Sequence, residues 1–182
     1  MKFSWNWLSD YVDLSGIAPS VVAERFTMTV AELEGVETIG EGLGGVLTGR
    51  ISALSQHPDA DKLKVFEIDL GGRTANGVSG APNLAVGMVV PVAEPGVVLP
   101  GGVEIRSAEI RGVRSEAVLL SERELGLSDD HSGVLELPAG TPVGRPLTEA
   151  VPYLRDTVFE VDNKSITNRP DLWGHEGIAR EV

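Results

Sequence analysis

A histidine and two aspartates lie within five residues of one polar segment, HPDADKL, which spans residues 57–63. His57, Asp59 and Asp61 are residue types that bind metal ions or transfer protons in catalysis. In an extended chain, side chains two positions apart point the same way, so the two carboxylates could act as a pair. However, zinc needs about four ligands and calcium six to eight oxygens, and the adjacent residues supply no more. We therefore predict no metal site, and keep a metal-dependent hydrolase only as an alternative.

The same segment has the composition of a turn between two strands. Pro58 fixes its own φ and favours extended geometry at His57. The carboxylate of Asp59 can accept backbone N–H groups in such a turn, and Leu63 returns the chain to the core. This interpretation predicts that Asp59→Ala lowers stability by about 1 kcal/mol without any catalytic loss.

Three other polar segments are also predicted to be structural. In SGAPN, residues 79–83, Gly80 can adopt a positive φ and Pro82 a fixed one, and no phosphate-binding glycine motif is present. DDHSG, residues 129–133, has the composition of an exposed loop. In NRPD, residues 168–171, Pro170 disfavours helix at Arg169, Asp171 can cap the following helix, and Arg169 could pair with an acidic group. No GxSxG motif supports a serine hydrolase.

Arginines and serines occur together in RGVRSEAVLLSERELG, residues 111–126. Arginine beside hydroxyl groups is typical of phosphate contacts. Alternatively, Arg114 and Arg123 are offset by Glu116, Glu122 and Glu124 on a solvated face. The sequence leaves both interpretations open.

The composition restricts the classes of function. The 182 residues include no cysteine, which excludes disulfides and thiolate zinc sites, and the formal net charge is −12. A tight, independent nucleic-acid binder is usually basic, so this charge argues against that role. No apolar run approaches the roughly 20 residues of a membrane span, and the N-terminus lacks a secretory signal. We expect a cytoplasmic protein with no membrane partner.

The pattern of strands and turns predicts a mainly β fold with an α+β flank. Residues 1–39 and 152–182 are expected to form a small discontinuous α+β domain, in which the strands near Val36 and Val158 are neighbours. Between them, residues 40–151 contain short apolar runs at 46–56, 63–71, 86–94, 103–112 and 133–138, and a brief helix near 121–126. This spacing predicts a small β-barrel. The last residues of the chain lie inside a helical pattern without a stop signal, which predicts a fragment of a longer protein.

Several of these segments, taken in order, resemble a known family. HPDADKL, VSGAPNLAVGMVVPVAEPGVVLPGG, IRGVRSE and LLSERELGL are similar to the tRNA-binding oligonucleotide/oligosaccharide-binding (OB) fold. The flanks KFSWNWLSDYVDL and VFEVDNKSITNRPDLWGHEGIARE resemble the N-terminal part of the bacterial phenylalanyl-tRNA synthetase β subunit. The resemblance implies an OB-fold barrel inserted into the α+β domain. An autonomous RNA-binding OB-fold module is the alternative, but such modules lack both flanks.

The resemblance also implies a role. Enzymes of this family attach phenylalanine to tRNA(Phe) with ATP and Mg²⁺, as assemblies of two α and two β subunits. Their aminoacylation site lies in the α subunit, and their editing site lies later in the β subunit. The chain itself is therefore expected to be a non-catalytic accessory module without a cofactor, whose partners are the α subunit, the rest of the β subunit and tRNA(Phe).

Two sets of residues follow as candidates. Those expected to contact RNA are Lys62, Lys64, Arg73, Asn76, Arg111, Arg114, Ser115 and Ser121. Those expected to set the shape of turns are His57, Pro58, Asp59, Asp61, Gly80, Pro82, Asn83, Asn168, Arg169, Pro170 and Asp171.

One segment departs from the family pattern. Related modules carry S-x-G-M after the Arg-Gly pair, in a region linked to RNA contact, whereas this chain has Ser115-Glu116-Ala117-Val118. Alanine restricts the close backbone approach that glycine permits, and Glu116 adds a negative charge. Residues 40–151 carry nine Lys and Arg against fifteen Asp and Glu, a net charge of −6. Both features predict weak direct binding of tRNA.

Overall fold

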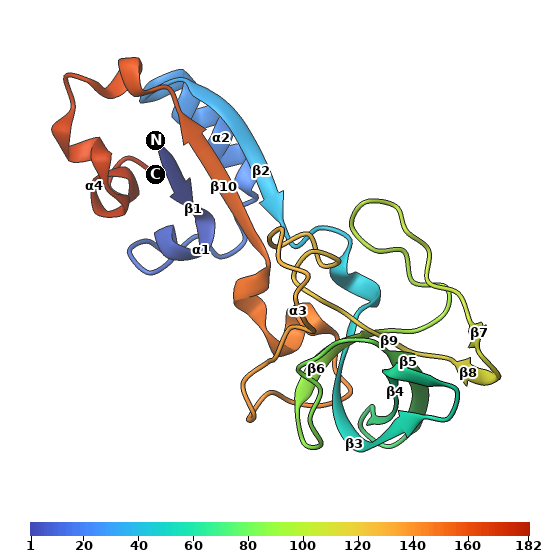
Figure 1. Cartoon of the computed structure of the whole chain (residues 1–182). Helices are drawn as coiled ribbons and strands as arrows, with labels where there is room; N and C mark the ends of the chain where they lie inside the picture. Colours follow the sequence, from blue (N-terminus) through green and yellow to red (C-terminus); the bar gives the residue numbers. More distant parts are fainter. The chain divides into compact units, whose positions relative to one another are not determined.

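The computed structural model describes residues 1–182 as two compact units (Figure 1). The flanking unit comprises residues 1–39 and 153–182, and the inserted unit comprises residues 40–152. As the sequence predicts, strands dominate the secondary structure. None of the helices has the length and hydrophobicity that crossing a bilayer requires.

The flanking unit is built on a three-stranded antiparallel sheet in the order β1-β10-β2. These strands are β1 (Lys2–Ser4), β10 (Asp156–Val161) and β2 (Leu33–Ile39). Strand β10 lies between the other two, and Val36 pairs with Phe159 while Val158 pairs with Glu37. The predicted neighbourhood of the strands near Val36 and Val158 is confirmed.

Short helices cover the apolar face of this sheet. They are α1 (Trp5–Leu8), α2 (Pro19–Thr29), η3 (Asn163–Ile166), η4 (Pro170–Trp173) and α4 (His175–Ala179). Ser4 caps α1 through its hydroxyl, and proline at the first position starts α2, because a proline there loses no helical hydrogen bond. The rings of Phe3 and Phe159 stack with centroids 4.8 Å apart, and Phe26 of α2 packs on Phe3 at 5.5 Å. These buried rings form the centre of the core.

The NRPD segment is held by an ion-pair network. Arg169 donates hydrogen bonds to both carboxylate oxygens of Asp171 and also pairs with Glu181. Pairing of Arg169 with an acidic group is therefore confirmed. The predicted cap at Asp171 is wrong: η4 begins at Pro170 without a side-chain cap, because the Asp171 carboxylate is taken by Arg169. The hydrogen bond from Arg169 holds the pKa of Asp171 below its usual value.

A histidine in the flanking unit should make its stability depend on pH. His175 Nε2 accepts the Ser4 amide at 3.0 Å, and its ring stacks on Trp7 at 3.9 Å. Burial lowers the pKa of His175, with Asp156 opposing this effect. A lowered pKa means that the unfolded state binds more protons, so stability is complete above about pH 6.5 and falls as the pH drops through this value towards the folded-state pKa.

We expect a small loss of a few tenths of a kcal/mol between pH 7.5 and 5.5, because the ring is partly exposed. All three tryptophans belong to the flanking unit, so urea unfolding followed by tryptophan fluorescence reports on it. His175→Gln keeps an acceptor but does not titrate, and should flatten this dependence. Equal slopes for the two proteins would contradict the assignment.

The inserted unit is built on a five-stranded antiparallel sheet in the order β5-β4-β3-β6-β9. The strands are β3 (Leu47–His57), β4 (Ala60–Asp69), β5 (Thr74–Ser79), β6 (Val89–Ala93) and β9 (Val118–Leu119). A separate hairpin pairs β7 (Ala108–Ile110) with β8 (Val113–Ser115). No ladder joins the two outer strands β5 and β9, so the pairing is that of an open sheet. The remaining helices of the chain are η1 (Leu43–Gly45), α3 (Leu147–Ala150) and η2 (Pro152–Leu154).

The core of the inserted unit lies on one face of this sheet. Phe66 and Ile68 alternate with exposed or half-buried positions along β4, as expected for a strand with one buried face. Strand β6 is buried at all five positions.

One of two sequence-based assignments in this unit is wrong. Residues 133–138 contribute only an isolated bridge from Leu137 to Val89, because Leu135 pairs by its amide with the loop residue Leu120 instead. The helical turn expected near 121–126 is present as a single turn: the Leu125 amide donates to the Ser121 carbonyl at 3.2 Å, and Gly126 ends the turn with a φ of 69°.

Candidate nucleic-acid interface

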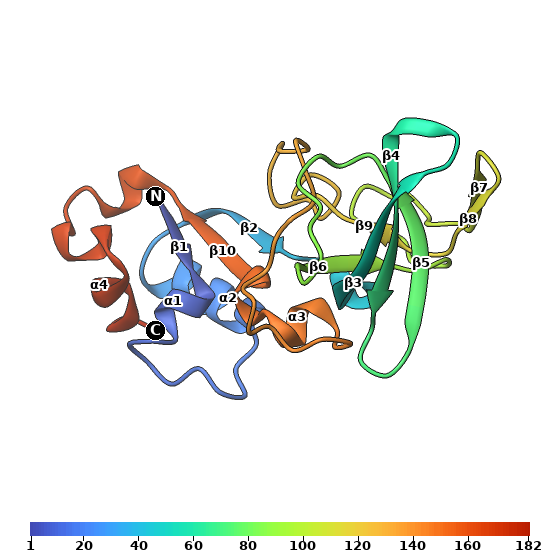
Figure 2. The ribbon, with the colours of Figure 1, turned by 60° about the horizontal axis from the view of Figure 1, so that its bottom comes forward.

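His57 holds two hairpins of the inserted unit together. The ring is 2% exposed, and its Nδ1 accepts the Asp59 amide at 3.1 Å. The proton is therefore assigned to Nε2, which donates to the Ile110 carbonyl at 3.0 Å. The β3–β4 turn is thereby joined to the β7–β8 hairpin, which lies beside it (Figures 1 and 2). With both nitrogens engaged by the backbone, His57 is a structural residue.

The Asp59 side chain does not cap the turn as predicted. The Asp59 carboxylate accepts no hydrogen bond, and the His57 ring caps the turn in its place. The Asp59 contribution is its carbonyl, which accepts Arg111 Nη1 at 2.8 Å. Gln56, which sequence reasoning missed, donates to the carbonyls of Ala60, Asp61 and Leu63 at 2.8–3.1 Å. Nowhere in the chain do three His, Cys, Asp or Glu side chains come together in a group that could hold a metal ion.

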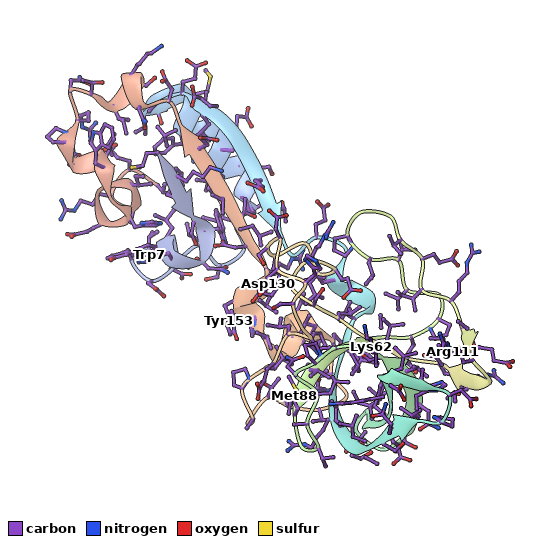
Figure 3. All side chains as sticks on the ribbon, viewed as in Figure 1. Trp7, Lys62, Met88, Arg111, Asp130 and Tyr153 are labelled. Atoms are coloured by element: carbon purple, nitrogen blue, oxygen red, sulfur yellow. The ribbon has the colours of Figure 1, made fainter.

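Arg111 occupies the tip of the β7–β8 hairpin (Figure 3). It has φ of 48° and Gly112 has φ of 82°, so both central residues of this two-residue turn are left-handed. This is the type I′ geometry that matches the twist of a hairpin. Arg111 is the only residue other than glycine with a positive φ, and its hydrogen bond to the Asp59 carbonyl compensates for the strain.

The segment that departs from the family pattern lies against the edge of β5. Ser115 is buried: its hydroxyl accepts the Val78 amide and donates to the Ala117 carbonyl, both at 3.2 Å. The Glu116 amide donates to the Asn76 carbonyl at 2.9 Å. The Ser115 hydroxyl therefore uses both its donor and its acceptor within the protein. Ala117 is itself part of the core.

Two candidate cations are neutralised by acidic neighbours. Arg73 pairs with both carboxylate oxygens of Glu94 at 2.5 Å, and this hydrogen bonding holds the pKa of Glu94 below its usual value. Arg114 pairs with Glu116 at 2.8 Å, so the glutamate of the departing segment offsets its neighbour.

The cations without an acidic partner form a smaller set. Lys62 and Lys64 of β4 and Arg111 are in no ion pair, and neither is Arg123. Lys64 pairs with Ser79 across the β4–β5 ladder, so the two side chains leave the same face of the sheet. Lys62, two residues earlier, follows the same alternation and is exposed (Figure 3).

A cavity of about 570 Å³ opens beside Ser79, and we call it the 79–134 cavity. Three segments line it. They contribute residues 79–82, residues 131–134, and the four residues Leu119, Ser121, Arg123 and Glu124. The expected tight loop at SGAPN thus forms one wall. Gly80 does not adopt the positive φ that we predicted, because the loop turns without it.

Two sets of side-chain hydrogen bonds fix the walls of the 79–134 cavity. The Asn83 amide group donates to the Val134 carbonyl at 2.8 Å and accepts the Val134 amide at 3.0 Å. Ser121 and Glu124 form a reciprocal capping box: Glu124 Oε2 accepts the Ser121 amide at 2.7 Å and its hydroxyl at 2.8 Å. Ser121 is therefore a structural residue as well as a lining residue.

The inserted unit lacks aromatic surface. Phe66 is the only Phe, Tyr or Trp among residues 40–152, and it is 1% exposed. Single-stranded nucleic acids commonly bind by stacking bases on aromatic side chains. Any nucleic-acid contact of this unit therefore lacks stacking on aromatic side chains.

Two comparisons of the sequence with known proteins, one with a family model and one with relatives, agree with each other. The family model described as "Putative tRNA binding domain" matches residues 46–146. Over its whole length the chain is 43% identical to the phenylalanine–tRNA ligase beta subunit of Desulfotalea psychrophila and 49% identical to that of Anaeromyxobacter dehalogenans. The chain spans 22% of the length of each of these relatives.

Among solved structures, a MetRS-related protein from Pyrococcus horikoshii aligns with 54% of this chain and 84% of its own. Its TM-score is 0.40 and its sequence identity 18%. The family match rests on the sequence comparison, which covers more than half of the chain. The chain belongs to the tRNA-binding domain family.

Proposed function

We propose that the chain is the N-terminal part of a phenylalanine–tRNA ligase β subunit and serves it as a non-catalytic accessory module. The observation that carries this proposal is the identity of 41–49% to such subunits over the whole chain, flanks included. ATP, Mg²⁺ and the attachment of phenylalanine to tRNA(Phe) belong to the rest of that enzyme. The flanking unit is an assembly element towards the α subunit and the remainder of the β subunit, and the site of action is the cytoplasm.

The inserted unit is, in this proposal, an OB-type barrel. Its five antiparallel strands support this, as does the covering of the free edge of β5. There, the Asn76 carbonyl accepts Glu116 and the Val78 amide donates to Ser115. These contacts bring the segment before β9 against β5, as closure of a barrel requires.

The inserted unit contacts tRNA weakly, through the face that carries Lys62, Lys64, Arg111 and Arg123. These are the candidate cations without an acidic partner. The net charge of −6 over residues 40–151 opposes the approach of a phosphate backbone. The contact therefore depends on the rest of the enzyme holding tRNA close to this face.

Titration of the purified chain with tRNA(Phe) at two salt concentrations tests this function. We expect a Kd above about 1 μM and a log–log salt slope of about −3 or shallower, because the proposed face carries four unpaired cations to meet phosphates. Replacing Lys62 and Lys64 together by glutamine should weaken binding about tenfold.

The matched control replaces Arg50 and Arg145 by glutamine, since these exposed cations are in no ion pair and Arg50 lies at the other end of the β3–β4 ladder. It removes the same charge and should have a smaller effect. Sub-micromolar binding with a steep slope would instead identify an autonomous RNA-binding module. Absence of binding at low salt would reject the RNA contact.

A further inference from the structure

We propose that the 79–134 cavity binds one unpaired RNA nucleotide whose base carries an exocyclic amino group. The inference rests on the proposed function, because it places the strongest contact of that RNA in the cavity. The lining combines apolar and polar groups. Leu119 and Val134 are buried members of the core and form apolar surface, whereas Arg123, Glu124 and His131 are exposed and polar. A planar base beside charged and hydroxyl groups fits such a lining.

Arg123 is the group that can bind the phosphate. Its acidic neighbours along the chain are both engaged elsewhere: Glu122 accepts the Ser128 hydroxyl at 2.6 Å, and Glu124 accepts Ser121. The guanidinium makes neither an ion pair nor a hydrogen bond, although its backbone is fixed by the bond from its amide to the Asp130 carbonyl at 2.9 Å. A cation on a fixed backbone with free donors is suited to a phosphate oxygen.

Glu124 is the group that can distinguish the base. Its Oε2 is used in the capping box, whereas its Oε1 has no hydrogen-bond partner. A free carboxylate oxygen accepts the amino group of cytosine, as acidic side chains do when they read cytosine N4 in DNA. Uracil has a carbonyl oxygen at the same ring position, and two acceptors facing each other repel. The site should therefore prefer cytosine to uracil.

Lys62 and Lys64 extend this site along the strand. Lys64 and Ser79 leave the same face of the sheet, and Ser79 lines the cavity. The phosphates next to the bound nucleotide can therefore meet the two lysines. An oligonucleotide should consequently bind more tightly than the free nucleotide.

The test is an NMR titration of the whole chain with (rC)6, (rU)6 and CMP at low salt. We expect (rC)6 to shift the amide signals of residues 79–82, 119–124 and 131–134. It should bind about fivefold more tightly than (rU)6, which is the scale of one good base contact. CMP should bind more weakly than (rC)6. If CMP binds as tightly as (rC)6, the ligand is a free nucleotide and the RNA assignment is wrong.

Two variants assign the roles. Arg123→Gln should weaken (rC)6 binding about tenfold, as expected for loss of a charge-assisted hydrogen bond. Arg145→Gln removes the same charge from an exposed position outside the cavity and should change (rC)6 binding less than twofold. Glu124→Gln keeps an oxygen for the capping box but adds an amide donor, so the preference for (rC)6 over (rU)6 should disappear.

The two proposals can fail separately. If (rC)6 shifts the signals of Lys62, Lys64 and Arg111 but not those of the cavity, the cavity site is wrong and RNA binding stands. The same holds if Arg123→Gln and Arg145→Gln weaken (rC)6 binding equally. If neither hexamer shifts any signal, RNA binding by the inserted unit is wrong, and the cavity site with it.

Discussion

Replacing Gly77 by alanine should destabilise the inserted unit by about 3 kcal/mol, the upper part of the range for overpacking a core. Gly77 pairs with Phe66 across the β4–β5 ladder, and the Phe66 ring covers it, as aromatic side chains often cover a glycine in a sheet. A Cβ there would lie 2.8 Å from Phe66 Cε1, and closer still to Phe66 Cζ and the Ala117 carbonyl oxygen. The ring is in the core and the carbonyl is backbone, so neither can give way without strain.

Native-state hydrogen exchange at the slowest amides of β3 and β4 measures this loss within the inserted unit itself. Gly44→Ala is the matched control, because no atom lies within 4 Å of a Cβ at that position and φ there is not in the left-handed region. It should leave the exchange free energies within about 0.5 kcal/mol. If the two variants exchange alike, the close approach of the 115–117 segment to β5 is wrong, and the proposed barrel closure loses its support.

Replacing His57 by alanine should cost about 3 kcal/mol, as much as the Gly77 change. The change removes a buried ring and leaves a cavity. It also removes the hydrogen bond to the Ile110 carbonyl, which joins the β3–β4 turn to the β7–β8 hairpin, and the bond from the Asp59 amide within the turn. The Ile110 carbonyl is then left without its donor at a half-buried position, which adds to the cost. Urea unfolding followed by far-UV circular dichroism measures the loss of stability.

Asp59→Ala is the matched control for His57→Ala, because its carboxylate makes no hydrogen bond and its useful groups are backbone atoms. It should change stability by less than about 0.5 kcal/mol, rather than the 1 kcal/mol expected from the sequence. A large effect of Asp59→Ala together with a small effect of His57→Ala would reverse the roles that the structure gives them. An equal and large effect of both would indicate that the two side chains act jointly.

The sequence predicts the strands where apolar alternation is strong, and misses β5 where it is weak. Thr74–Ser79 reads TANGVS, in which Asn76 and Gly77 have low strand propensity. It is a strand because it pairs with β4 along its whole length and because Phe66 covers Gly77. Both causes are tertiary contacts, so local propensity could not show them.

The candidate site illustrates the same limit. The turn role of HPDADKL follows from its composition, but the choice of His57 rather than Asp59 as the capping group depends on the approach of the β7–β8 hairpin. The charge pattern of the sequence does not distinguish Arg114 from Arg123 as a group free to bind phosphate. Only the fold shows that Glu116 pairs with Arg114, whereas no acidic group pairs with Arg123. The 79–134 cavity is assembled from segments up to about fifty residues apart, for which no spacing rule exists.

The position of β10 has a consequence for the order in which the chain folds during synthesis. Strand β10 lies between β1 and β2, which do not pair with each other, so the sheet of the flanking unit cannot form until residue 161 has left the ribosome. Translation from β2 to β10 takes about ten seconds at ordinary rates. All strands of the inserted unit emerge within that interval and need no residue of β10. The inserted unit therefore folds first. During this interval the phenylalanines of the nascent N-terminus lack their partner strand, so they are exposed to aggregation or to chaperones.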